Sequence, residues 1–359
     1  MMSLKILFLT VALSVPLIAS QTANGCDAKC TFAKNFTTET IGSFPKSCAK
    51  VCSSIRIDWD SKLSEQQLTN AFKSMKTLVG GLRISGTTFT SLKFLAGLQK
   101  IESGLEPVVI WNNSQLATLG MKNLTSIAGS DFSVYDNKKL TRLNLPKLKS
   151  VKGESSIWFS LNIYIKNNDL KNFCLTSQEL KAFMVADPLQ TGIHITGKVC
   201  PPPKFTPKIC KTLAATCVEL YGNLNIGAKF AVKKVKSLKF LYGSLSVKNT
   251  NFTNLKFLSN LTHAVQLNDT KIAINVQGNK KLTSAAIPKL KGIIAPTLDP
   301  FYNRIITVNF KNNHKNLLND VDSCYALKSA MYENSYEVPQ FNGQTCEQID
   351  PNHFYEYLG

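Results

Sequence analysis

A short pattern of apolar and polar residues recurs along the chain: apolar-x-apolar-x-x-Asn-x-x-Leu. It is clearest at residues 108–116, 132–140 and 274–282. Two apolar residues separated by one other residue predict a short strand with one buried face. The Asn predicts a bend in which its side chain satisfies backbone groups, and the Leu returns to the core. Each copy of the pattern therefore predicts one strand followed by a turn.

Looser copies extend the pattern through both halves of the chain, and their first apolar residues are Leu82, Ile163, Leu245 and Val308. In the N-terminal half the second apolar residues follow one another after 26, 24 and 31 residues, at Ile84, Ile110, Val134 and Ile165. These intervals are typical of leucine-rich solenoids. Because a single unit cannot bury its apolar face alone, the units must stack. We therefore expect a β-rich solenoid fold.

The two halves of the chain resemble each other. Residues 78–98 and 241–261 are identical at 11 of 21 positions with an offset of 163. Residues 137–151 and 279–293 are identical at 9 of 15 positions with an offset of 142. The difference between the offsets is close to the length of one unit. The sequence therefore indicates a duplicated domain whose second copy has one unit fewer.

The N-terminus has the features of a secretory signal peptide. Residues 1–20 contain one Lys, then an apolar run of about ten residues, then two small residues. This run is too short to span a bilayer, and the C-terminus has no hydrophobic tail of the kind that precedes a GPI anchor. We expect a secreted, soluble, extracellular protein with no transmembrane segment in the mature chain. Sequons for N-glycosylation occur at Asn35, Asn112, Asn123, Asn251, Asn260 and Asn268.

Ten cysteines agree with an oxidising compartment. They lie near the ends of the two repeat regions and outside the repeats themselves, at the places where a solenoid needs caps. We expect pairs Cys174–Cys200, Cys210–Cys217 and Cys324–Cys346. For the first four cysteines, the nested pairs Cys26–Cys52 and Cys30–Cys48 are favoured, although other connectivities stay open. A zinc site built from four cysteines is the alternative, but no Cys-x2-Cys pair supports it.

The chain is strongly basic, with 42 Lys and Arg against 23 Asp and Glu. Thirty-eight of these basic residues are Lys, whereas readers of phosphates and bases favour the Arg fork. We therefore do not expect a nucleic-acid partner. Residues 21–328 carry a net charge of +23, and the last 31 residues carry −5. The lysines either solvate the loops or attract acidic glycans and anionic cell surfaces.

No pattern of catalytic residues is present. The sequence lacks G-x-S-x-G, H-E-x-x-H, P-loop and G-x-G-x-x-G motifs. The four histidines, His194, His263, His314 and His353, share no spacing with Asp or Cys, and cysteines held in disulfides cannot act as nucleophiles. We expect no enzyme activity, no cofactor and no metal.

Two predicted strands have the same form, Gly-x-Leu-x-Ile: Gly-Gly-Leu-Arg-Ile at 80–84 and Gly-Asn-Leu-Asn-Ile at 222–226. Together with the two Cys-capped repeat regions, they resemble the receptor L domains of the insulin and EGF receptors, and most closely a family of such proteins that is expanded in nematodes. The resemblance covers roughly residues 45–350 and implies a right-handed β-helix for each domain, with short helices. It departs from the full receptors because a short Pro-rich linker replaces the Cys-rich module, and no transmembrane helix or kinase follows.

The predicted organisation is a signal peptide (1–20), a Cys-rich N-terminal cap (21–54), a first L domain (55–200), a Pro-rich linker (201–209), a second L domain (210–346) and an acidic tail (347–359).

The residues between the inward apolar positions should point outward from the strands. In the first domain this places Arg83, Val109, Ser133 and Tyr164 in one column and Ser85, Trp111, Tyr135 and Lys166 in the next. Exposed Trp and Tyr with a nearby Arg are typical of protein-binding hot spots. We take Arg83, Val109, Trp111, Tyr135, Tyr164 and Lys166 as candidate binding residues. The other interpretation is that stacked aromatic rings only stabilise the sheet.

The second domain should be polar in the same two columns, at Ser246, Asn275 and Asn309 and at Lys248, Gln277 and Lys311. By resemblance, the protein would bind an extracellular polypeptide as a decoy or modulator, such as an insulin-like or EGF-like ligand or a receptor ectodomain. The alternative is an adhesive solenoid of the extracellular matrix or cell surface that binds acidic glycans through its lysines.

Overall fold

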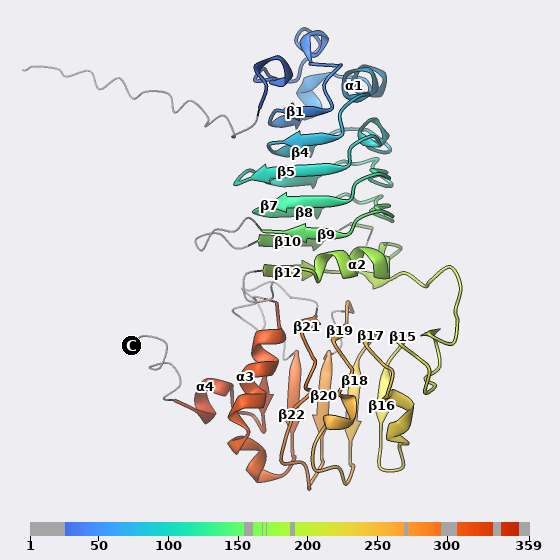
Figure 1. Cartoon of the computed structure of the whole chain (residues 1–359), viewed down its shortest axis with the longest axis vertical. Coiled ribbons are helices and arrows are strands. Elements are labelled where there is room, and N and C mark those ends of the chain that lie inside the picture. Colours follow the sequence, from blue (N-terminus) through green and yellow to red (C-terminus); the bar gives the residue numbers. More distant parts are fainter. Residues whose placement is uncertain are drawn as a thin grey trace, which may run out of the picture.

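A computed structural model describes residues 26–153, 161–166, 168–169, 171–186, 191–268, 272–295, 307–332 and 339–351. The predicted signal peptide and most of the predicted acidic tail lie outside these residues. The described part is β-rich, with parallel sheets and short helices. It forms two halves, of which the first is blue to green and the second yellow to red in Figure 1.

The first half contains two parallel sheets between which the chain alternates. The sheet that carries the sequence pattern, here called the motif sheet, has the order β12-β10-β8-β6-β4-β2. Its strands are β2 (Ile55–Ile57), β4 (Leu82–Ser85), β6 (Val108–Trp111), β8 (Asp131–Tyr135), β10 (Leu161–Lys166) and β12 (Thr191–Ile195). The opposite sheet contains β1 (Lys50–Cys52), β3 (Thr77–Val79), β5 (Lys100–Gly104), β7 (Ser126–Gly129) and β9 (Ser150–Lys152). A separate pair joins β11 (Cys174–Leu175) to β13 (Lys198–Val199).

The second half repeats this arrangement. Its motif sheet contains β16 (Leu224–Ile226), β18 (Leu245–Lys248), β20 (Ile274–Gln277), β22 (Val308–Lys311) and β23 (Gln340–Phe341). Its opposite sheet contains β14 (Ile209–Cys210), β15 (Glu219–Tyr221), β17 (Phe240–Tyr242), β19 (His263–Val265) and β21 (Gly292–Ile294). Among the described residues, the second motif sheet has five strands and the first has six, as the shorter sequence offset indicates.

Short helices lie at the ends and corners of both halves. The α-helices are α1 (Glu65–Phe72), α2 (Ser177–Phe183), α3 (Val321–Ala330) and α4 (Cys346–Ile349). The 3-10 helices are η1 (Ala28–Cys30), η2 (Ile41–Ser43), η3 (Trp59–Ser61), η4 (Lys93–Leu95), η6 (Val232–Val235), η7 (Lys256–Leu258) and η8 (Lys315–Asn319). Helices α1 and α2 begin with capping boxes, Ser64 with Gln67 and Thr176 with Glu179, which satisfy backbone N–H groups that have no helical partner.

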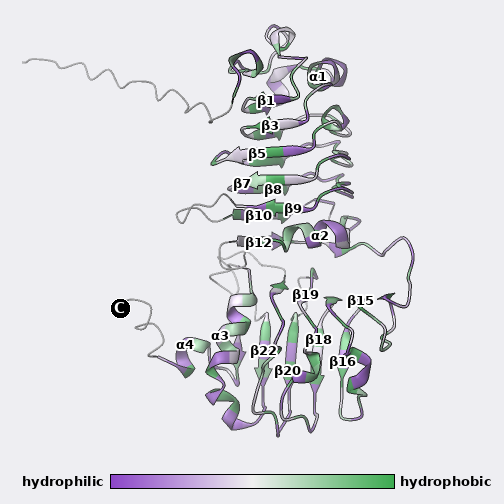
Figure 2. Cartoon of the chain, viewed as in Figure 1, coloured by the Kyte–Doolittle hydropathy of each residue, from purple (hydrophilic) through white to green (hydrophobic). Residues whose placement is uncertain are grey.

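The recurring Asn of the pattern is buried and bonds one repeat to the preceding repeat. Asn137 Nδ2 donates to the carbonyl of Ile110 at 3.0 Å, and its backbone N–H donates to Asn168 Oδ1 at 3.2 Å. In the second half Asn279 Nδ2 donates to the carbonyl of Val247 at 3.1 Å. Buried amides with these partners stay satisfied, so the same residue type recurs after successive strands, along which apolar (green) and polar (purple) positions are mixed in Figure 2.

Five disulfides close the ends of the two halves. They join Cys26 to Cys52, Cys30 to Cys48, Cys174 to Cys200, Cys210 to Cys217 and Cys324 to Cys346, which are the expected pairs. One detail differs from the expectation, because Cys52, Cys174 and Cys210 lie inside the short edge strands β1, β11 and β14. Three of the five disulfides thus attach a neighbouring segment directly to a short edge strand. The described cysteines include no free thiol that could bind zinc.

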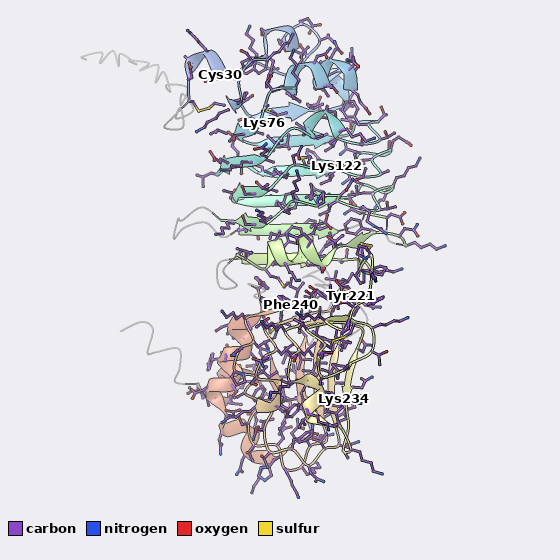
Figure 3. All side chains as sticks on the ribbon, turned by 45° about the vertical axis from the view of Figure 1, so that its right-hand side comes forward. Cys30, Lys76, Lys122, Tyr221, Lys234 and Phe240 are labelled. Atoms are coloured by element: carbon purple, nitrogen blue, oxygen red, sulfur yellow. A yellow bond between two sulfur atoms is a disulfide. The ribbon has the colours of Figure 1, made fainter. Side chains whose placement is uncertain are left out.

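The two halves meet where α2 lies against the opposite sheet of the second half. Lys181 Nζ of α2 is 2.6 Å from Glu219 Oε1 and 4.7 Å from the centre of the Phe240 ring. The hydroxyl of Tyr332 donates to the carbonyl of Met184 at 3.2 Å. Figure 3 labels Tyr221 and Phe240 at this junction. Tyr242, Val265, Leu267 and Ile294 of the second half belong to the buried core of the first half, so the junction continues that core.

Candidate functional site

The outward columns of the first motif sheet have the expected register. Arg83 pairs with Val109, Val109 with Ser133, and Ser133 with Tyr164. In the next column, Ser85 pairs with Trp111, Trp111 with Tyr135, and Tyr135 with Lys166. All six candidate binding residues therefore lie on one face of one parallel sheet, whose neighbouring strands are about 4.8 Å apart.

The aromatic side chains on this face contact one another. The rings of Trp111 and Tyr135 are stacked with centres 6.3 Å apart and an angle of 18° between their planes. Tyr135 meets Tyr164 edge to face at 5.5 Å, and Tyr164 meets His194 of β12 at 6.3 Å. Lys166 Nζ lies 5.2 Å from the centre of the Tyr164 ring. These rings are half-buried, so their mutual contacts leave part of each ring in solvent.

A carboxylate and an arginine lie beside the aromatic rings. Ser133 Oγ donates to Asp131 Oδ1 at 2.5 Å. Burial raises the pKa of the Asp131 carboxyl, while the Ser133 hydrogen bond and the Arg83 charge act in the opposite direction. Burial also raises the pKa of the Tyr135 hydroxyl, with further contributions from the charges of Asp136 and Asp131. The face thus combines hydroxyl donors, one carboxylate and cations around an aromatic centre.

His194 is held neutral by its surroundings. Burial lowers the pKa of His194 to about 4, and the positive charge of Lys166 contributes in the same direction. The histidine therefore acts at neutral pH as an aromatic ring and hydrogen-bonding group of the face. Ile193 and Ile195 flank His194 as in the other strands, but the Asn and Leu of the pattern do not follow, so the sequence did not predict that β12 joins the motif sheet.

Sequence reasoning also missed Trp59. Its side chain is 74% exposed, the largest exposure of any large hydrophobic residue that the structure describes. A Cβ on Gly86 would lie 3.4 Å from Trp59 Cδ1, so Trp59 lies beside the end of β4, which separates it from β6 and Trp111. Its position follows a strand and begins η3, outside the alternating columns that guided the prediction.

The equivalent face of the second half is polar. Ser246 pairs with Asn275 and Asn275 with Asn309, while Lys248 pairs with Gln277 and Gln277 with Lys311. These are the residues expected from the sequence. No aromatic side chain lies in the paired columns of these strands, so the aromatic surface belongs to the first half.

The predicted sequons differ in their surroundings. Asn112 is exposed, has a positive φ of 54° and follows Trp111 directly. Asn35, Asn251 and Asn268 are also exposed. By contrast, Asn123 Nδ2 donates to the carbonyl of Ala96 at 2.9 Å, and Asn260 Nδ2 donates to the carbonyl of Lys236 at 2.7 Å. A glycan on Asn112 would stand beside the aromatic face.

A cavity of about 660 Å³ lies at the junction of the two halves, away from the aromatic face. Phe173, Phe205, Tyr221 and Leu267 contribute to its walls. Among the described residues, no group of three or more His, Cys, Asp and Glu side chains could hold a metal ion. The described helices are all too short or too polar to cross a membrane.

Comparison with known proteins gives two findings. A family model described as Receptor L domain matches residues 47–132 and 216–328, which together make up more than half of the chain. Protein irld-34 of Caenorhabditis elegans is 22% identical over 305 residues, which cover 80% of this chain and 70% of that protein. Both halves of the molecule thus match the same family model, once each.

Proposed function

Because the chain belongs to the receptor L domain family, we propose that it is a non-catalytic binding protein that captures an extracellular polypeptide on the motif sheet of its first half. The observation that carries this proposal is the run Trp111, Tyr135 and Tyr164, whose half-exposed rings are in contact across three adjacent strands. Large aromatic side chains lose little conformational entropy on binding and dominate the energy of protein interfaces.

The charges around the rings support recognition of a polypeptide. Arg83 and Asp131 lie at one side of the aromatic run and Lys166 at the other. A partner could therefore bury apolar side chains on the rings while its own charged groups pair with this rim, which is the usual division of an interface. Trp59 would extend the contact toward β2.

The same proposal includes the kind of ligand, the role of the protein, the fold of each half and its location. The ligand would be an insulin-like or EGF-like factor or a receptor ectodomain, and the protein would act as a secreted decoy or modulator. Each half would be a right-handed β-helix domain with the boundaries given above, which the alternation of the chain between two parallel sheets supports. The five disulfides agree with an extracellular location.

The test is capture of an insulin-like peptide and an EGF-like domain by the full chain at physiological salt. In the double variant Trp111→Ala/Tyr135→Ala we expect affinity to fall by at least a hundredfold, since hot-spot truncations cost about 2 kcal/mol or more. The matched control is Lys248→Ala/Gln277→Ala, which changes the same columns of the second motif sheet and should leave affinity unchanged.

A stability measurement separates binding from a purely structural role of the rings. Cross-strand pairs contribute roughly 0.2–1 kcal/mol, so the double variant should keep its denaturant midpoint nearly unchanged while it loses binding. Unchanged capture by the double variant would contradict the proposal. Capture that disappears at high salt and does not depend on Trp111 would favour the adhesive alternative instead, because exposed charges are screened by salt.

A further inference from the structure

The lysines of the second half are concentrated in one stretch with almost no acidic residues. Residues 220–295 contain twelve Lys, no Arg and one Asp. The equivalent stretch of the first half, residues 57–153, contains thirteen basic and seven acidic residues. The excess positive charge is therefore a property of the second half, and the fold decides where it gathers.

Seven of these lysines lie on the corner of the second half that leads into its opposite sheet. This lysine flank consists of Lys233, Lys234, Lys236, Lys239, Lys256, Lys289 and Lys291. All seven are exposed, and no ion pair joins any of them to an acidic residue within the described part of the chain. Figure 3 labels Lys234 in the second half, below the junction.

The backbone holds the flank in a regular row. The N–H of Thr262 donates to the carbonyl of Lys239 at 2.9 Å, and the N–H of Lys291 donates to the carbonyl of Thr262 at 2.8 Å. Lys239 and Lys291 thus precede β17 and β21, which are separated by one strand and lie about 10 Å apart. Lys239 and Lys291 therefore stand at matching positions of two repeats, with the uncharged Thr262 between them.

Asn260 contacts two further residues of the flank, Lys236 and Lys289. Its Nδ2 donates to the carbonyl of Lys236 at 2.7 Å, and its Oδ1 accepts from Lys289 Nζ at 3.1 Å. Asn260 therefore links the backbone at Lys236 to the ammonium group of Lys289. The Lys289 side chain, held by this bond, loses less conformational entropy on binding than a free lysine would.

We propose that the lysine flank binds a sulfated polysaccharide. A linear chain with regularly spaced anionic groups matches a row of cations none of which is paired with an acidic residue in the described part of the chain. The flank contains no Arg, and the stacked rings of Phe240 and His263 beside it are half-buried, with Lys181 over Phe240, so they offer no open platform of the kind on which single-stranded nucleic acids stack. Val232, 37% exposed, is its one exposed large hydrophobic residue, too little to anchor it in a lipid surface. This surface is separate from the aromatic face and does not depend on the function proposed for that face.

Heparin is the probe, used with the full chain on an affinity column and in binding measurements between 0.1 and about 0.5 M NaCl. The flank variant is Lys233→Gln/Lys234→Gln/Lys236→Gln. The matched control, Lys248→Gln/Lys280→Gln/Lys311→Gln, removes the same charge from other exposed positions of the same half. In polyanion binding each lost contact lowers the slope of log K against log salt by roughly one. We expect the magnitude of this slope to be smaller by about three in the flank variant and unchanged in the control variant.

Three outcomes would overturn the proposal. The parent protein could elute below physiological salt, the two triple variants could weaken equally, which would indicate diffuse charge, or anionic phospholipid vesicles could be bound in preference to heparin. Because Asn260 lies in a sequon inside the flank, the protein is measured before and after an endoglycosidase has trimmed its N-glycans to one sugar. The trimmed protein must show the dependence on the flank lysines.

Discussion

In the first half the outward aromatic side chains lie on the motif sheet, whereas in the second half they lie on the opposite sheet. Trp111, Tyr135 and Tyr164 face solvent in the first half. The aromatic residues of the second half, Tyr221, Phe240 and Tyr242, are covered by α2 of the first. Two halves of one family, with the same strand alternation, therefore use outward aromatic residues for different purposes.

The difference shows how to separate packing residues from candidate binding residues. The opposite sheet of the second half has a partner within the chain, the helix α2. Lys181 of this helix lies over the Phe240 ring, and Tyr242 is part of the buried core. The first motif sheet has no such partner among the described residues. An outward aromatic residue supports a binding role only where the rest of the molecule leaves it open.

The largest effect is expected at the junction. Tyr242 is 4% exposed, and its ring centre lies 4.7 Å from that of Tyr221. The change Tyr242→Ala should lower the free energy of unfolding by about 3–5 kcal/mol, because a buried aromatic ring is replaced by a cavity. Chemical denaturation followed by circular dichroism measures this loss. Tyr135→Ala on the open face serves as the comparison and should cost less than about 1 kcal/mol; equal losses would show that both faces only pack.

Acid should destabilise both halves through one histidine each. Burial lowers the pKa of His263 to about 4, with a smaller contribution from Lys291, and lowers that of His194 to about 4. In the unfolded chain these groups bind protons near pH 6.5, so the unfolded state takes up protons first as pH falls. The free energy of unfolding is therefore highest above about pH 6.5. It falls as the pH is lowered toward 4, by roughly 3 kcal/mol for each histidine.

Denaturant midpoints measured from pH 7.5 to 4 test this pH dependence. The variants His263→Gln and His194→Gln should each flatten the curve by about half, since each removes one titrating group. His263 stacks on Phe240 with ring centres 5.2 Å apart, so the His263→Gln variant reports on the junction. The His194→Gln variant reports on the open aromatic face. A curve of unchanged steepness in both variants would assign the acid sensitivity to other groups.

A smaller effect is expected for the ion pair at the junction. The change Lys181→Met keeps the apolar stem but leaves Glu219, whose side chain is 15% exposed, without its cation. We expect a loss of about 1–3 kcal/mol, the usual cost of a partly buried polar group without its partner. Lys138→Met is the matched control, because its ion pair with Asp136 lies on the surface and should contribute less than about 1 kcal/mol. The denaturant midpoints of the two variants should differ accordingly.

Much of the candidate face could be predicted because strand geometry is local. The alternation around Ile110 and Val134 determines which residues point inward, and the spacing of the repeats aligns Trp111 with Tyr135. The position of the cysteines at the ends of the repeat regions indicated three of the disulfides, whereas the pairing of the first four cysteines was open until the structure joined Cys26 to Cys52 and Cys30 to Cys48. Trp59 and His194 could not be placed on the face in this way, since one follows a strand and the other belongs to a strand without the complete pattern.

By itself the sequence determined the inward face of each strand, the similarity of the two halves, the position of the cysteines at the ends of the repeat regions and the basic character of the chain. These properties depend on the alternation of side chains along a strand and on spacing along the chain. Only the tertiary structure decided which outward face is covered. Phe240 and Trp111 occupy similar outward positions in their own segments, and the difference between them comes from α2, which packs on one and not on the other. Burial of an outward residue depends on contacts between distant segments, which no local pattern records.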